Sequence, residues 1–454
     1  MTELSRRGLL LGAGLSLALF EARAAPESAA RLEARPQRLR LGPAPGPEIE
    51  AFAFNGATPA PLLRARAGAP MRLAFANALA QPASFGFLGL ALPNPQDGVA
   101  PLTQKPIAPG DAFDLSFTPR RAGLFAYRPL FAPTAAEQLG RGLYGAFIVD
   151  EDAPPQADRE LVAVVADWRL AAGGGLDPDF SPGPEAAAGA GERLVTVEGA
   201  PAPLEFSARP NARVRLRLVS MAAARVFVAA FEGTKPMVVA VDGVPANAAF
   251  EPARRSIPVG PGARFDIFFD MPGAGETARV LMKTEDGAQA PLVSLRAEGE
   301  PLPARPPVPS LPLDPLLPAR IKLEAAKRAD FVIEPAATPG RAPDGTPLLW
   351  RVNGALDAPF AAKPVLTLKS GAPATLALVN RSPLAQQIHL RGHHMRLLHD
   401  LDDGWEPYWR DCVLVPPGRT KRVAFAAGAP GRWALLSLTP ARCAAGLAGH
   451  IVVT

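Results

Sequence analysis

Short apolar runs that alternate with polar residues recur along most of this 454-residue chain. Three of the alternating segments, at 109–117, 261–269 and 417–425, begin with a Pro-Gly pair. Side chains of a β-strand point in turn to the two faces of a sheet, so a period of two indicates a strand with one buried face. A Pro-Gly pair is typical of the turn before such a strand. The pattern predicts an all-β chain.

A second segment also occurs three times. FNGATPAPL at 54–62 corresponds to VEGAPAPL at 197–204 and, more loosely, to VNGA at 352–355. Each copy precedes an alternating strand, and the spacing predicts three Greek-key β-sandwich units of about 120–150 residues each. We expect these units at 35–152, 153–299 and 319–454, with a stiff proline-rich linker at 300–318.

Composition adds little to this fold but limits the function. Hydrophobic residues make up 48% of the chain, which also has 53 Pro and 41 Gly, as expected of a turn-rich β protein. The net charge is +5, but the arginines are scattered and alternate with apolar residues within strands, as at 214–219. This pattern favours a solvated sheet face over a nucleic-acid-binding stripe. We therefore expect no nucleic-acid partner.

Residues 1–24 have the features of a targeting segment. Arg6 and Arg7 precede an apolar run at 9–20, and Ala22-Arg23-Ala24 offers a small-x-small cleavage site. The run is shorter than the roughly 20 residues that span a bilayer. We predict a twin-arginine signal, export by the twin-arginine translocase, cleavage near Ala25, and a periplasmic protein with no stable membrane span. An uncleaved anchor is the alternative.

The last third of the chain carries three segments with fixed landmarks: IHLRGH at 388–393, VLVPPG at 413–418, and a stretch from Trp433 to Leu447. They resemble the last domain of multicopper oxidases, whose pattern is H-P-x-H-L-H-G-H, then V-x-V-P-P-G, then W-x-x-H-C-H-x-x-x-H-x-x-x-G-M. Gly392, Trp433 and Gly446 help to set the register. The resemblance covers nearly the whole chain after residue 24 and implies three consecutive cupredoxin-like domains.

The resemblance also implies twelve copper-ligand positions, and His389 alone keeps the family's residue there. The twelve positions are Gly86, Leu88, Arg128, Leu130, Gln386, His389, Arg391, Leu436, Ser437, Leu438, Arg442 and Leu447. Copper clusters of this type need imidazole for nearly every ligand and a thiolate at the electron-entry copper. The chain has five histidines, all at or after position 389. We expect no copper, no other cofactor and no catalytic residue.

The substituted positions suggest a filled cavity. Leu88, Leu130, Leu436 and Leu438, at trinuclear positions, would restore apolar packing. The guanidinium groups of Arg128 and Arg391 cannot bind copper. A buried arginine is costly unless it is paired, and Asp97 matches an acidic residue that oxidases place beside their trinuclear site. We predict an Asp97–Arg128 or Asp97–Arg391 ion pair, which a separation above about 6 Å would refute. The alternative is an anion or ligand pocket.

The histidines and two cysteines allow further chemistry. His389, His393, His394 and His399, with Asp400, Asp402 and Asp403, could form a metal cluster. On one strand, however, His389 and His393 would lie about 13 Å apart, whereas ligands must lie within about 2–2.5 Å of one ion. We expect structural histidines, with His393 the remaining candidate ligand. Cys412 and Cys443 could form a disulfide in an oxidising compartment or remain buried thiols, and the sequence leaves both possibilities open.

The leading functional hypothesis is a non-catalytic periplasmic binding or scaffold protein on a degenerate multicopper-oxidase fold. Copper-less family members imply protein partners in the periplasm, including the cell-division machinery. The alternative is an oxidoreductase that binds copper through non-standard ligands. A carrier that holds a small ligand between domains is a third possibility.

Overall fold

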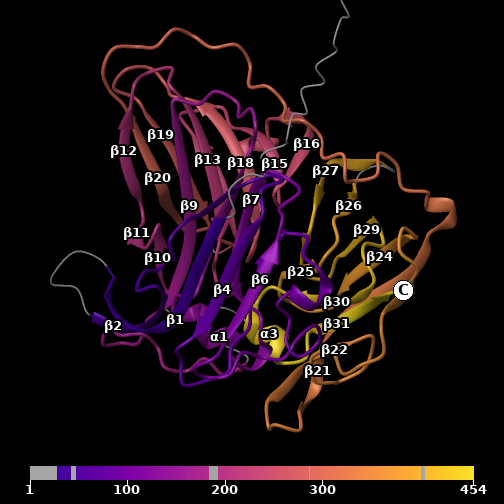
Figure 1. Cartoon of the computed structure of the whole chain (residues 1–454). Helices are drawn as coiled ribbons and strands as arrows, with labels where there is room; N and C mark the ends of the chain where they lie inside the picture. Colours follow the sequence, from indigo (N-terminus) through magenta and orange to yellow (C-terminus); the bar gives the residue numbers. More distant parts are fainter. Residues whose placement is uncertain (1–27, 42–47, 184–192, 286, 400–403) are drawn as a thin grey trace, which may run out of the picture.

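The computed structural model describes residues 28–41, 48–183, 193–285, 287–399 and 404–454. In these residues six β-sheets form three consecutive units, which confirms the predicted all-β fold of three sandwich domains (Figure 1). The predicted signal segment and Asp400, Asp402 and Asp403 lie outside the described residues. No helix within the described residues is long and apolar enough to cross a membrane.

The first unit pairs two four-stranded sheets, β2-β1-β4-β6 and β3-β8-β7-β5. Its strands are β1 (Ser28–Arg40), β2 (Glu48–Phe54), β3 (Leu63–Arg66), β4 (Met71–Asn77), β5 (Phe85–Leu88), β6 (Ala112–Phe117), β7 (Gly123–Pro129) and β8 (Gly145–Asp150). A 3₁₀ turn η1 (Asn94–Gln96) and the helix α1 (Ala132–Gly140) lie in its connections.

The second unit has a seven-stranded sheet, β11-β10-β9-β13-β18-β15-β16, and a five-stranded sheet, β12-β20-β19-β14-β17. Its strands are β9 (Arg159–Arg169), β10 (Arg193–Val197), β11 (Ala200–Pro201), β12 (Leu204–Ala208), β13 (Arg213–Ser220), β14 (Phe227–Glu232), β15 (Met237–Val241), β16 (Val244–Phe250), β17 (Ser256–Val259), β18 (Arg264–Asp270), β19 (Thr277–Lys283) and β20 (Gln289–Ala297). The 3₁₀ turn η2 (Ala253–Arg255) precedes β17.

The third unit has a six-stranded sheet, β22-β21-β24-β29-β26-β27, and a five-stranded sheet, β23-β31-β30-β25-β28. Its elements are η3 (Leu323–Ala325), β21 (Lys327–Arg341), β22 (Pro347–Val352), β23 (Leu366–Leu368), β24 (Pro373–Asn380), β25 (Gln386–Leu390), β26 (Met395–Leu398), β27 (Trp405–Arg410), β28 (Cys412–Val415), β29 (Thr420–Ala426), β30 (Gly431–Ser437), the helix α3 (Pro440–Ala444) and β31 (Ala448–Val453).

The sequence repeat has a structural cause. In each unit a strand pairs in parallel with the alternating strand that follows the repeat, as β1 with β4, β9 with β13 and β21 with β24. The repeat itself forms a turn with two positive φ angles, for example 52° at Asn55 and 82° at Gly56, which Asn and Gly tolerate best. The Asn55 side chain then accepts from the Glu33 amide and donates to the Arg31 carbonyl. Asn353 makes the corresponding pair of bonds in the third unit.

The prediction of a solvated arginine face at 214–219 was wrong. Arg215 and Arg217 on β13 are 1% and 0% exposed. Asp266, on the neighbouring strand β18, lies 2.6 Å from Arg215 and 3.2 Å from Arg217, and Glu151 pairs with Arg215 as well. Carboxylates from other parts of the chain therefore cover and neutralise this face.

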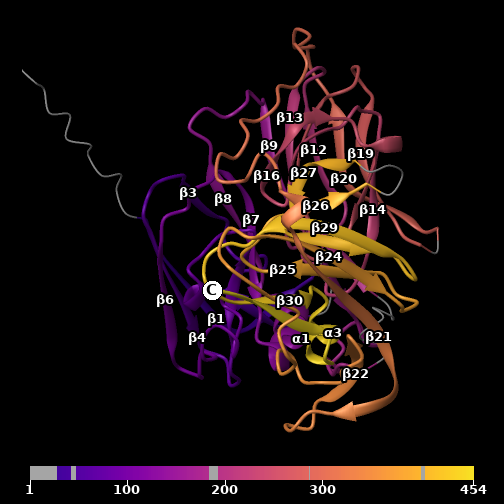
Figure 2. The same cartoon turned by 90° about the vertical axis from the view of Figure 1, so that its right-hand side faces the viewer.

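The three units meet around a shared apolar core. The third unit, in orange and yellow, lies against both of the others (Figure 2), through contacts of α1 with α3 and of β16 with β27. Besides the core inside each sandwich, one buried cluster takes residues from all three units. This junction contains four of the implied copper-ligand positions, Leu88, Leu130, Leu436 and Leu438.

Candidate functional site

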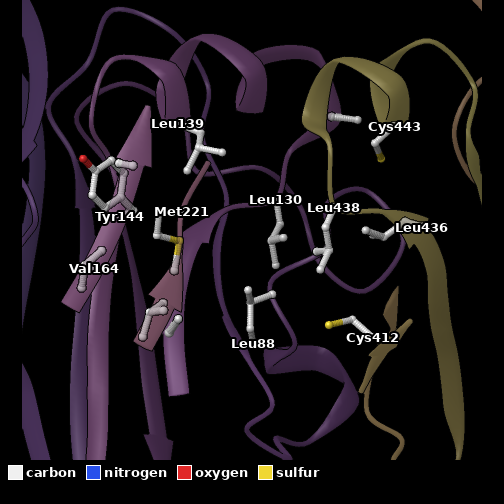
Figure 3. Packing of buried hydrophobic residues seen from close by; sticks show 14 of the residues in the cluster. Leu88, Leu130, Leu139, Tyr144, Val164, Met221, Cys412, Leu436, Leu438 and Cys443 are labelled. Atoms are coloured by element: carbon white, nitrogen blue, oxygen red, sulfur yellow. The ribbon is translucent and has the colours of Figure 1, made fainter. Parts of the chain in front are cut away.

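Four leucines fill the centre of the junction between the three units. Leu88 at the end of β5, Leu130 after β7, Leu436 on β30 and Leu438 just beyond it are at most 7% exposed, and Figure 3 shows them around one centre. The second unit closes against them at Gly262, where an added Cβ would lie 2.8 Å from Leu438 Cδ1 and 3.0 Å from Leu88 Cδ1. The leucines thus form a close-packed apolar plug.

Beside this plug, the structure forms the second of the two ion pairs considered from the sequence, Asp97–Arg391. Arg391 Nη2 lies 2.8 Å from Asp97 Oδ1, and its Nε lies 3.0 Å from Oδ2. The same guanidinium donates to the backbone carbonyls of Asp97 and Phe87, each at 2.5 Å. Both side chains are almost completely buried. Four hydrogen bonds therefore join the first unit to the third.

Arg128 enters the junction without such a partner. It is 2% exposed, and among the described residues its Nε and Nη1 have no hydrogen-bond partner. Burial lowers its pKa to about 10, and the positive charge of Arg391 acts in the same direction. The guanidinium therefore stays protonated at neutral pH, so two arginines and one carboxylate leave a net positive charge.

The remaining implied ligand positions carry no thiolate, and two of them, Gln386 and Arg442, belong to a polar network. Arg442 donates to the side-chain oxygen of Gln386 at 2.9 Å, and Gln386 donates to Ser382 Oγ at 3.0 Å. Ser437 Oγ accepts from the Thr439 amide, and Leu447 is completely buried. Burial lowers the pKa of Arg442 to about 10, so it too is a cation at neutral pH.

His389, His393 and His394 line one small cavity with Asp411, but among the described residues no histidine belongs to a group of three ligand atoms within 4.8 Å of one another. The strand that carries His389 ends at Leu390, and Gly392 has a φ of 68°, so the assumption of one continuous strand was wrong. His393 Nδ1 lies 2.8 Å from the Arg391 carbonyl, and its Nε2 accepts from the Gly428 amide at 2.9 Å. Burial lowers the pKa of His393 to about 4, so it is neutral.

His394 and His450 face arginines instead. His394 Nε2 is 2.9 Å from Arg121, and His450 Nε2 is 3.4 Å from Arg432. Burial lowers the pKa of each imidazole, and the neighbouring arginine lowers it further.

A buried acid pair near His389 was missed by the sequence reasoning. Asp411 Oδ2 lies 2.5 Å from Arg264 Nη2 and 3.6 Å from His389 Nε2. Burial opposes ionisation of Asp411, but Arg264 and His389 outweigh it and hold the Asp411 pKa below its usual value. Asp242 accepts from the Arg264 amide at 3.1 Å, and burial, with the charge of Asp411, raises its pKa to about 6. Asp242 and Asp411 stand 169 residues apart, so no local motif could have pointed to the pair.

Both cysteines are free, buried thiols, so of the two possibilities the structure has no disulfide. Cys412 Sγ donates to Asp242 at 3.3 Å and accepts from Gln387 at 2.9 Å. Burial raises the Cys443 pKa to about 12, although nearby Arg128 lowers it in part. Neither cysteine is a thiolate at neutral pH.

Comparison with known proteins identifies the class. Three family models described as multicopper oxidase match residues 38–154, 165–285 and 333–454. The chain belongs to the multicopper oxidase family and consists of three cupredoxin-like domains.

Individual relatives agree with this assignment. Multicopper oxidase MmcO of Mycobacterium tuberculosis is 26% identical over 93% of this chain and 87% of its own. Copper resistance protein A of Escherichia coli is 34% identical over 27% of this chain and 20% of its own. The crystal structure of a multicopper oxidase from Pseudomonas thermotolerans matches with a TM-score of 0.82 and 29% identity, over 95% of this chain and all of that one.

The residues at the junction do not fit the family's copper. Leucine has no donor atom, and arginine has no free lone pair to offer a metal. Among the implied positions that the structure brings together, His389 alone carries an imidazole, and its Nε2 faces Asp411.

Proposed function

We propose that this chain is a multicopper-oxidase-fold protein that works by binding other molecules rather than by oxidation. The observation that carries the proposal is the Asp97–Arg391 ion pair. Arg391 stands where the resemblance implies a histidine ligand, and its guanidinium donates four hydrogen bonds that hold two domains together. A cation at this position repels a metal ion.

The leucine plug supports the same proposal. An oxidase needs an open space where dioxygen and copper meet, whereas Leu88, Leu130, Leu436 and Leu438 lie in one buried cluster, and Leu88 and Leu438 close against Gly262. Burying each leucine contributes about 1.5–3 kcal/mol to folding. The region that holds the active site in an oxidase would then stabilise the fold here and keep the three domains in a fixed arrangement.

Location and partners extend the proposal. The twin-arginine motif at residues 6–7 favours export to the periplasm by the twin-arginine translocase. Resemblance to the copper-less protein SufI, also called FtsP, suggests protein partners in the division machinery. Deletion of the gene should then impair septation, most clearly under envelope stress. Normal division in the deletion strain under that stress would remove this part of the proposal.

The competing function is an oxidoreductase with unfamiliar metal ligands, and one observation favours it. Ligand atoms of Asp242, Asp411 and Cys412, all buried, lie within 4.8 Å of one another. Arg264 already neutralises Asp411, however, and the Cys412 thiol has a pKa raised well above its usual value, mainly by burial. A metal would have to displace the arginine and deprotonate the thiol.

Metal content separates the two functions. The protein purified from the periplasm is measured by mass spectrometry before and after copper loading, with oxidation of a phenol followed in parallel. We expect a folded protein without stoichiometric copper and without turnover. Stoichiometric copper that disappears in the Cys412→Ser variant, together with turnover, would establish the oxidoreductase instead.

A further inference from the structure

A cavity of about 330 Å³ lies in the third domain, between the segment that leads into η3 and the strands β26 and β27. Residues of the segment 318–324 form one wall, and Arg396, Trp405 and Trp409 form the other. The volume falls in the range of about 300–1,000 Å³ that small-molecule sites occupy. The cavity shares no residue with the leucine plug or with the implied copper positions.

Trp405 marks this cavity as unusual within the chain. Of the five tryptophans, Trp168, Trp350, Trp409 and Trp433 are at most 5% exposed, whereas Trp405 is partly exposed. An indole left open at the wall of a cavity offers a flat apolar surface on which a ring can stack. The position of Trp405 therefore indicates a planar ligand.

The charged residues around the cavity indicate the sign of the ligand's charge. The Arg396 guanidinium lies over the Trp409 ring, with Cζ 5.0 Å from its centroid, and donates to Asn247 at 3.1 Å. Its Nε is buried without a hydrogen-bond partner in the described part of the chain, and burial lowers its pKa. Arg320, in the opposite wall, is exposed and forms no ion pair among the described residues. A partly desolvated guanidinium that forms no ion pair among the described residues favours an anion, and its planar fork matches a carboxylate.

We propose that this cavity binds a small aromatic carboxylate. Its ring stacks on Trp405, and its carboxylate faces Arg396 with Arg320 nearby. Glu324 lines the same cavity and has no ion pair in the described residues, so it favours a ligand that carries a hydrogen-bond donor away from the carboxylate. The site is independent of the proposed function, because it requires neither a metal nor a protein partner.

Three probes test the site on the full chain after removal of any signal segment. Calorimetric titration compares 4-hydroxybenzoate, benzoate and the neutral analogue benzyl alcohol, and quenching of tryptophan fluorescence reports contact with Trp405. We expect saturable binding of both carboxylates and at least about tenfold weaker binding of benzyl alcohol, as expected for loss of a charge-assisted hydrogen bond. The Glu324→Gln variant should reduce the preference for 4-hydroxybenzoate over benzoate.

Two variants identify the charges that matter. Arg396→Gln should weaken benzoate binding about tenfold or more, whereas Arg279→Gln, an equal loss of charge on the exposed face of β19, should not change it. If Arg396→Gln does not fold, Arg320→Gln carries the test, because Arg320 is exposed and has no ion pair within the part of the chain that the structure describes. Absence of saturable binding, equal binding of benzyl alcohol, or equal weakening by Arg279→Gln would each overturn the proposal.

Discussion

Arg128 and Arg391 lie in one junction, yet replacement by methionine should have opposite effects on stability. Arg128 has no counter-charge in the described structure, and the fall in its pKa to about 10 means that burial disfavours the charged form by roughly 3 kcal/mol. Methionine keeps most of the apolar stem and removes that cost. We expect Arg128→Met to raise the free energy of unfolding by roughly 1–3 kcal/mol, in the range seen when buried charges are replaced by apolar residues.

Arg391→Met is the matched control. It leaves the buried Asp97 carboxylate without its partner, which typically costs about 3–5 kcal/mol. Both variants replace one buried arginine by methionine, so they differ only in which arginine is lost.

Scanning calorimetry at neutral pH measures both variants against the parent protein. Arg128 is protonated in the folded and unfolded states at this pH, so its contribution does not change with small changes of pH. The melting temperature should rise for Arg128→Met and fall for Arg391→Met. A fall of similar size for both would refute the reasoning, because it would mean that Arg128 has a stabilising partner.

Three further predictions concern neighbouring groups. The His393 pKa of about 4 lies below that of an unfolded histidine, so the folded state binds fewer protons, and the free energy of unfolding should fall by up to roughly 3 kcal/mol as pH drops from about 6.5 to 4. Denaturant titrations at pH 7 and pH 5 should show a smaller loss of stability in the His393→Gln variant than in the parent protein. An equal loss in both would contradict this prediction. In urea titrations, Gly262→Ala should destabilise the protein by roughly 1–3 kcal/mol more than Gly418→Ala. Both glycines have positive φ, but an added Cβ would meet Leu438 and Leu88 at Gly262 and nothing within 4 Å at Gly418. Equal losses of stability would argue against a close-packed leucine plug. Cys412 and Cys443 should react with a thiol reagent only after denaturation, and fewer than two reactive thiols would point to oxidation.

Repeats and turns could be predicted from the sequence because their causes are local. The turn at residues 55–56 needs two positive φ angles, so Gly recurs at its second position in all three copies, and Asn stands at the first position in two of them, with Glu198 in the other. The alternating pattern likewise predicts strands, because the period of two is a property of the strand itself. Three domains followed from these signals without knowledge of contacts between them.

The buried charges could not be predicted in the same way. Arg215 and Arg217 alternate with apolar residues as they would on a solvated face, and the carboxylates that cover them come from Glu151 and Asp266, about fifty to sixty positions away. The sequence also could not choose between Arg128 and Arg391 as the partner of Asp97, because the choice depends on how two domains approach. Gly392 was the missed local signal, since its positive φ ends the strand before His393.

The bond between Asp97 and Arg391 connects positions that are 294 residues apart. During synthesis the first domain would be complete long before the arginine that neutralises its buried carboxylate has been made. Until then Asp97 must remain hydrated, and the edge of the domain around it cannot close. The first domain therefore reaches its final packing only when the third domain has been made. In a chain that ends before residue 391, the region around Asp97 would stay open and hydrated.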